Sequence, residues 1–116
     1  MDDSKISFEV TIKLAIEYWK LLRSYDRVIS VLPPDNRLSS VARNADRKLH
    51  SILQEATLSL ISYEGQEYSA NLAVTAINSD EFEGGDSLRV SQMIEPTVIR
   101  NGSVVSVGKA LVAVSY

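Results

Sequence analysis

The stretch TVIRNGSVV, residues 97–105, decides the fold of the second half of this chain. Asn101-Gly102 stands between two short runs rich in β-branched residues, Thr97–Arg100 and Ser103–Val107. Both central residues of a type I′ turn need positive φ, which an Asn-Gly pair tolerates best. The stretch therefore predicts a β-hairpin with a two-residue turn.

The pattern around this hairpin also has period two, with valine, isoleucine and threonine in place of helix formers. It predicts four further strands, at Glu67–Asn71, Ala73–Ile77, Ser87–Met93 and Lys109–Ser115. Several short strands within about fifty residues form a small β module, which needs helices or a partner to cover its core.

The first part of the chain has a helical pattern, from about Ser4 to Leu32. Two apolar rows run along it, one residue out of step: Leu14, Tyr18, Leu21, Tyr25, Val28 and Leu32, and Phe8, Ile12, Ala15, Trp19, Leu22 and Ile29. Together they make a stripe wider than a two-stranded coiled coil requires, which is typical of a helix with two neighbours. Pro33-Pro34 ends this helix, because proline lacks an amide donor and disfavours helix in the preceding residue.

A second helix is predicted from about Leu38 to Ser62, capped by Asp35 or Asn36, or later by Ser39, and stopped by Gly65. The short link makes the two helices an antiparallel hairpin. Two helices cannot bury both rows of the first one, so a homodimeric four-helix bundle completes the core. The predicted fold is α+β, with a dimerising helical hairpin over residues 1–64 and a small all-β domain over 65–116.

The dimer interface is predicted on apolar and aromatic residues of both helices: Leu14, Tyr18, Trp19, Leu21, Leu22, Tyr25, Leu49 and Ile52.

Composition narrows the function classes. The 116 residues include 12 basic and 15 acidic ones, a net charge of −3. This sign argues against nucleic-acid or anionic-membrane binding, which needs a basic excess. The absence of cysteine excludes disulfides, thiolate metal sites and a thiol nucleophile. The acidic N-terminus is not a secretory signal, and no apolar run approaches the ~20 residues that span a bilayer. A cytoplasmic location is predicted.

The turn between Ile77 and Ser87 places four carboxylates in seven residues: Asp80, Glu81, Glu83 and Asp86. A calcium loop of the EF-hand type would need alternating ligands, a central glycine and flanking helices. Here Asp80 and Glu81 are adjacent, and the glycines follow the acids. A catalytic acid pair would need partners that orient and desolvate it. A solvated loop, or a loop that docks a partner, remains.

The rest of the chain offers no enzyme site. His50 is the only histidine and lies mid-helix, and the serines lack a nearby histidine-acid pair or a G-x-S-x-G turn. The basic side of the second helix is diluted by acids and is interpreted as a solvated face: Arg37, Arg43, Arg47 and Lys48. We predict no catalytic residue, no cofactor and no metal site.

The stretch from Ala73 to Val90 resembles the β domain of the GrpE family, the nucleotide exchange factors of DnaK-type heat-shock chaperones. An alanine-valine pair, an acidic pair, a glycine and a second strand follow one another without a gap, at Ala73-Val74, Ser79-Asp80-Glu81, Gly85 and Leu88-x-Val90. The order of parts, helices first and a β module last, is also that of the family.

Weaker similarities lie outside this stretch. Gly65-x-x-Tyr68 is similar to the glycine and aromatic that open the family's β domain, and Asn71 follows. Leu21-Leu22-x-x-Tyr25-Asp26 resembles the family's LLPVLD segment, and Val107–Val114 lies where the family has an LRPAMVVV-like closing strand.

The chain also departs from the family. Ser69-Ala70 and Ala73 replace a proline and a histidine, and Gly108-Lys109 replaces an arginine-proline. Only Gln92 remains of a QKGY stretch, and the long N-terminal coiled coil of typical members has no counterpart. The resemblance is therefore to a divergent, shortened GrpE-like protein.

The resemblance implies a co-chaperone in protein folding and stress response, which binds the ATPase domain of a DnaK-type chaperone and promotes ADP release. It implies partner contacts in the β domain: Ser91, Gln92, Met93, Ile94, Arg100, Asn101 and Val114. Two alternatives remain, a dimeric adaptor that has lost exchange activity and a biotinyl- or lipoyl-like carrier. The carrier is weaker, because Asn101-Gly102 rather than a lysine occupies the hairpin tip.

Overall fold

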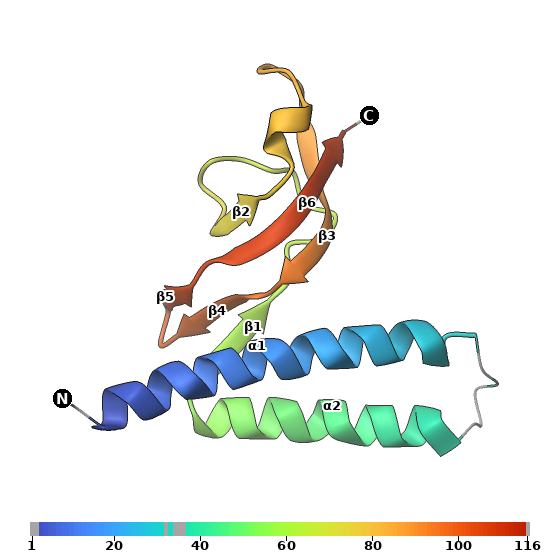
Figure 1. The fold of residues 1–116 in the computed structure, drawn as a ribbon, viewed down its shortest axis with the longest axis vertical. Coiled ribbons are helices and arrows are strands. Elements are labelled where there is room, and N and C mark those ends of the chain that lie inside the picture. Colours follow the sequence, from blue (N-terminus) through green and yellow to red (C-terminus); the bar gives the residue numbers. More distant parts are fainter. Residues whose placement is uncertain (1–2, 32, 34–36, 116) are drawn as a thin grey trace. The chain divides into compact units, whose positions relative to one another are not determined.

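The computed structural model describes residues 3–31, 33 and 37–115, with side chains from residue 8 onward. The chain divides into two compact units, residues 1–58 and residues 59–116. The first holds two helices, and six strands follow, arranged in two small sheets (Figure 1). The predicted α+β class is confirmed.

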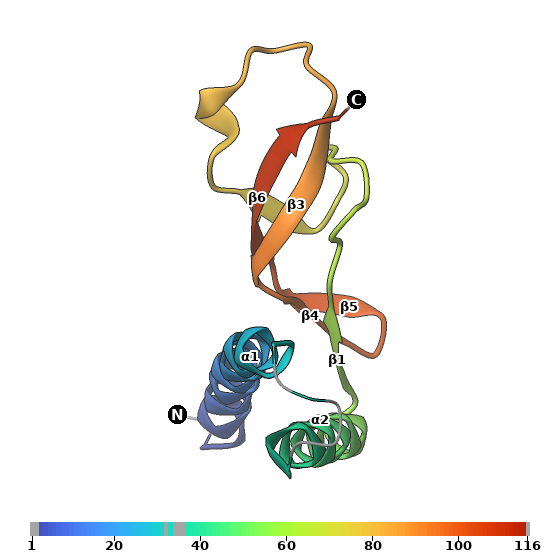
Figure 2. The same cartoon turned by 90° about the vertical axis from the view of Figure 1, so that its right-hand side faces the viewer.

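The helical unit is a hairpin of α1 (Asp3–Ile29) and α2 (Arg37–Glu55), which lie side by side in both views (Figures 1 and 2). α1 ends at Ile29, three residues before the predicted end at Leu32, and the predicted caps Asp35 and Asn36 lie outside the described residues. Ser39 is a buried residue inside α2, so it is not the residue that begins the helix.

The second helix ends earlier than predicted. α2 stops at Glu55 rather than Ser62, and Leu58–Ile61 forms strand β1 instead of a further helical turn. The stop is at Thr57, whose φ is 57°. A left-handed residue just beyond a helix turns the chain away from the helix axis, which glycine usually does at low cost. The predicted stop at Gly65 was therefore wrong.

Replacing Thr57 with glycine is expected to stabilise the chain by about 1 kcal/mol. A β-branched residue in the left-handed region is strained by roughly 1–2 kcal/mol, and only part is offset by its hydroxyl, which donates to the Ala56 carbonyl at 2.6 Å. Urea unfolding followed by circular dichroism measures the change. Thr75→Gly, in strand β2, is the matched control and should lower the free energy of unfolding. A lower urea midpoint for Thr57→Gly than for the wild-type chain would contradict the expectation.

The β unit contains two three-stranded sheets, in the orders β1-β4-β5 and β2-β6-β3. In the second sheet β2 runs parallel to β6, and β3 runs antiparallel to it. The remaining bounds are β2 (Val74–Ala76), β3 (Leu88–Glu95), β4 (Thr97–Arg100), β5 (Ser103–Ser106) and β6 (Gly108–Val114). Five of the six predicted strands are confirmed to within two residues at each end.

The hairpin predicted around Asn101-Gly102 forms between β4 and β5. Asn101 has φ 50° and Gly102 has φ 82°, and Arg100 pairs directly with Ser103 across the turn. Both central residues thus have the positive φ of a type I′ turn.

The predicted strand at Glu67–Asn71 is wrong: its one ladder contact is an isolated bridge from Glu67 to Arg89. Residues 64–68 instead follow the outer edge of β3 irregularly. Three backbone hydrogen bonds join them to β3: the Gly65 amide donates to the Val90 carbonyl (2.8 Å), the Val90 amide to the Gln66 carbonyl (2.9 Å), and the Tyr68 amide to the Leu88 carbonyl (2.8 Å). In addition, the Met93 amide donates to the Glu64 carboxylate at 2.9 Å. The edge of β3 is therefore covered without a regular strand.

The core of the β unit is a set of small and medium apolar side chains from β2, β3, β4 and β6: Val74, Ala76, Val90, Met93, Val98, Ala110 and Val112. The buried polar Thr97 is satisfied, because its hydroxyl donates to the Ala73 carbonyl and accepts the Gly108 amide at 3.1 Å. One side chain thus links the start of β4 to β6 and to the approach to β2.

Candidate partner-binding surfaces

The helical unit carries a broad exposed apolar face. On α1, Val10, Leu14, Leu21 and Val28 recur at spacings of four and seven, which places them on one side of a helix. Leu14 is 68% exposed and Leu21 is 65% exposed. We call the following residues the apolar face: Val10, Leu14, Tyr18, Leu21 and Val28 of α1, and Leu38, Val41 and Ile52 of α2.

A groove of about 350 Å³ joins the two helices on this face. Its lining is almost entirely apolar: Thr11, Leu14, Ala15 and Tyr18 of α1, and Lys48, Leu49, Ile52, Leu53 and Ala56 of α2. Lys48 is the one charged side chain among these described residues. The groove shows that Leu14 and Tyr18 share a surface with Ile52.

The residues predicted for the dimer interface fall into two groups. Leu14, Tyr18, Leu21 and Ile52 belong to the apolar face. Leu49 is buried and lines the groove, and three aromatic or apolar residues of α1 are half-buried: Trp19, Leu22 and Tyr25. Trp19 also carries the Arg23 guanidinium over its ring, 4.9 Å from the centroid.

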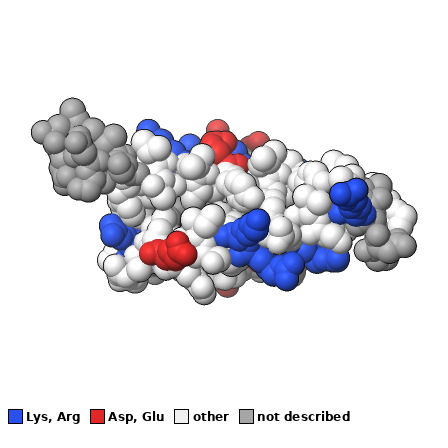
Figure 3. Space-filling model, turned by 90° about the horizontal axis from the view of Figure 1, so that it is seen from below, with Lys and Arg blue, Asp and Glu red and all other residues white. Residues whose placement is uncertain are grey.

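The interface prediction left out Val10, Val28, Leu38 and Val41, although the same helical spacing identifies them. Figure 3 looks onto the helical unit and shows a largely uncharged surface, with several Lys and Arg side chains next to one another along its lower edge. The apolar rows of the sequence thus identify apolar side chains that are exposed in one chain, and the dimer interface itself stays a prediction.

In the β unit, two predicted contact residues lie on β-bulges of β3. Ser91 and Ile94 are the extra residues where the pairing of β3 with β6 shifts register. Bulges turn side chains out of the regular alternation and often lie beside functional sites. Ser91 is exposed, with its hydroxyl donating to the Leu111 carbonyl at 3.0 Å, and Gln92 beside it is half-buried, as is Val114 opposite Leu88.

Met93 is misplaced in the predicted contact set, because its side chain is only 2% exposed and belongs to the core. A surface contact through Met93 would require opening the β unit. Arg100 and Asn101 are exposed, but they lie at the tip of the β4–β5 hairpin, in the other sheet from Ser91. The structure therefore places Ser91 next to Gln92 on β3 and keeps both the hairpin tip and Val114 separate from them, since Val114 lies opposite Leu88 and on the same face of β6 as the buried Val112.

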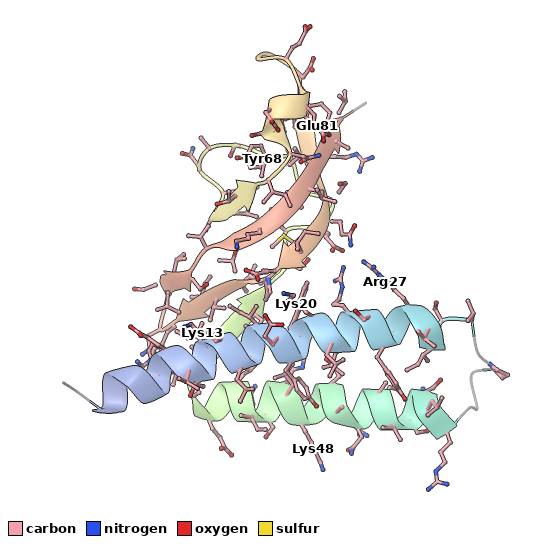
Figure 4. The ribbon with its side chains drawn as sticks, viewed as in Figure 1. Lys13, Lys20, Arg27, Lys48, Tyr68 and Glu81 are labelled. Carbon is pink, nitrogen blue, oxygen red and sulfur yellow. The ribbon has the colours of Figure 1, made fainter. Side chains whose placement is uncertain are left out.

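The acidic turn forms the 3₁₀ helix η1 (Ser79–Glu81) and the loop after it, and all four carboxylates are exposed. Glu83, Asp86 and Glu67 surround a hollow of about 390 Å³ with Tyr68 and Phe82. Within the described residues, no three His, Asp or Glu side chains are placed to hold a metal ion. Figure 4 shows the positions of Tyr68 and Glu81 in this region.

Asn78, which the sequence argument passed over, fastens this turn to the sheet. Its side-chain amide donates to the Val112 carbonyl at 3.0 Å, and its side-chain oxygen accepts the Val112 amide at 2.9 Å. The side chain thus copies the pairing of a strand beside β6. In the sequence, an asparagine that directly follows the predicted strand Ala73–Ile77 is the feature that could have indicated this role, because asparagine side chains bond readily to backbone groups.

An apolar edge is a second feature that the sequence argument missed. Within the described residues β5 pairs on one side only, with β4, and it carries no charge. Val104, Val105 and nearby Val107 are exposed. Uncharged edges are capable of pairing with other chains.

Charge is distributed unevenly between the units. Residues 59–116 contain three basic and seven acidic residues, a net charge of −4, whereas residues 1–58 contain nine and eight, a net charge of +1. Among the cations of the helices, Lys13, Lys20 and Arg27 project from α1 on the side opposite to Lys48 of α2 (Figure 4). The β unit therefore carries the excess of negative charge.

The described helices include none that combines the length and the apolar character needed to cross a bilayer. No family model, no curated protein and no solved structure matches this chain.

Proposed function

We propose that this chain is a GrpE-like nucleotide exchange factor, which binds the ATPase domain of a DnaK-type chaperone through its β unit and promotes ADP release. The observation that carries the proposal is the agreement between the quoted motif and the observed elements. Val74 begins β2, Ser79–Glu81 forms η1, Gly85 has φ 108°, and Leu88 begins β3. Each part of the family pattern thus corresponds to a distinct structural feature.

The mechanism is a population shift rather than a chemical step. A binding protein accelerates ADP release only if it prefers the ATPase conformation in which the nucleotide has fewer contacts. Moving that equilibrium from 1:99 to 99:1 requires about 10⁴-fold preference for the open state. No group of the exchange factor needs to react, so the proposal requires no catalytic residue.

The surface that serves this function is centred on Ser91 and Gln92, on strand β3 of the β2-β6-β3 sheet. The bulge at Ser91 interrupts the ladder and leaves that side chain exposed. The net charge of −4 on the β unit steers encounter with a basic patch and affects the association rate more than the final affinity.

The proposal includes a homodimer in which two helical hairpins pack into a four-helix bundle through the apolar face. From their exposed fractions, the eight residues of this face present roughly 700 Å² per copy, close to the ~800 Å² that each partner buries in a standard interface. Helices with two apolar stripes bury the second one against another helix pair. A second copy supplies such a pair.

The test measures release of a fluorescent ADP analogue from a DnaK-type chaperone mixed with this chain. Release should accelerate with the wild-type chain, and Ser91→Arg should weaken the acceleration by about tenfold or more, because a charged side chain is then forced into the interface. Ser51→Arg adds the same side chain on an exposed position of α2 and is the matched control.

Two outcomes contradict the proposal. Binding to the chaperone without faster ADP release would favour the adaptor alternative. The absence of both binding and release would remove the chaperone as the partner.

A further inference from the structure

The apolar face of the helical unit carries two charges of opposite sign. Glu17 lies between Leu14 and Leu21 on α1, three and four residues from them, and its side chain is 66% exposed. Lys48 is exposed and lines the groove beside Ile52 on α2. Each charge therefore lies next to a residue that the proposed dimer buries.

Within the described part of one chain, Glu17 has a charged partner and the Lys48 side chain has none. Glu17 pairs with Lys20 on its own helix, with 3.3 Å between the carboxylate and the ammonium. The Lys48 ammonium makes no hydrogen bond or ion pair with another described residue. A helix pair that covers the apolar face would remove water from Lys48, and an unpaired ammonium loses free energy there.

A twofold interface has a reciprocal property: if one residue contacts a second residue of the partner, the second contacts the first in return. An acid on one helix and a base on the other satisfy this rule without bringing like charges together. This rests on the dimer of the proposed function. We propose that Glu17 of each copy forms an ion pair with Lys48 of the second copy, and that the two equivalent pairs set the register in which the hairpins pack.

The register needs such a device, because leucine and valine faces pack at several offsets with similar burial. A shift of one helical turn would move each carboxylate about 5 Å from its ammonium. The aligned arrangement alone forms both pairs. Electrostatic pairs of this kind contribute to specificity as well as to affinity.

The experiment is a charge exchange, with the dimer dissociation constant measured by analytical ultracentrifugation. Glu17→Lys and Lys48→Glu should each raise that constant by about tenfold or more, because each brings two pairs of like charges together. The double variant should return it to within about threefold of the wild-type value. Arg47→Glu reverses a neighbouring exposed charge outside the groove lining and should leave the constant unchanged.

The outcomes separate this inference from the dimer itself. A wild-type dimer whose double variant stays as weak as the single variants would overturn the ion pair and leave the dimer standing. A wild-type chain that sediments at 12.8 kDa at every concentration would overturn both. If a charge reversal unfolds the helices, Glu17→Gln and Lys48→Gln in a double-mutant cycle measure the same coupling, and a coupling of zero would overturn the pair.

Discussion

Replacing Gly108 with alanine is expected to lower the free energy of unfolding of the β unit by about 3 kcal/mol or more. Gly108 is buried and begins β6, at the point where β6 meets the start of β4. A Cβ there would lie 2.7 Å from the Glu95 carbonyl oxygen and 2.7 Å from the Thr97 hydroxyl. Both distances are below 3.0 Å, a separation that Cβ atoms in folded proteins essentially never show.

The neighbours cannot move without losing other bonds. The Thr97 hydroxyl accepts the Gly108 amide and also donates to the Ala73 carbonyl. The Thr97 amide nitrogen, 2.8 Å from the added atom, belongs to the backbone of β4. Displacing Thr97 therefore breaks a buried polar network and leaves its groups without partners, which costs more than the clash alone.

Urea unfolding followed by circular dichroism in the β region measures this loss. Gly84→Ala is the matched control, since no atom lies within 4 Å of a Cβ added there and its φ is not in the positive range. The control should change the stability by less than about 0.5 kcal/mol. Equal midpoints for the two variants would contradict the tight approach at Gly108.

Local chemistry made most of the fold predictable. The Asn101-Gly102 turn needed only two adjacent residues to be recognised, and the strands beside it followed from their alternation. The end of α2 was not predictable in this way, because Leu58–Ile61 suits a helix as well as a strand and Thr57 is a poor stop signal. Pairing in the sheet decided the matter, and pairing depends on distant residues.

The candidate surfaces were predictable only in outline. The two apolar rows of α1 indicated that one row would be buried and one left exposed, and Ile12 and Leu14 differ in that way. The bulges at Ser91 and Ile94 depend on the register of β3 against β6, which no local pattern encodes. For the same reason Met93 was mistaken for a surface residue: a bulge changes which side chains face the core.

The second large effect is expected at the apolar face. Leu21→Asp, combined with Leu14→Asp, should convert the proposed dimer into a monomer of 12.8 kDa. Burying a leucine contributes about 1.5–3 kcal/mol, and each substitution occurs twice in a symmetric dimer. The dissociation constant should therefore rise by about a thousandfold or more, because every 1.4 kcal/mol is a factor of ten.

The measurement is sedimentation at micromolar concentration, with circular dichroism to show that the helices persist. Ser51→Asp adds the same charge to an exposed position of α2 outside the apolar face and should leave the dimer intact. A double variant that still sediments as a dimer would place the interface elsewhere, and the uncharged edge of β5 would then be the next surface to examine. Since Leu14 and Leu21 are more than 60% exposed in one chain, loss of the dimer without loss of helix would trace the effect to association rather than to folding.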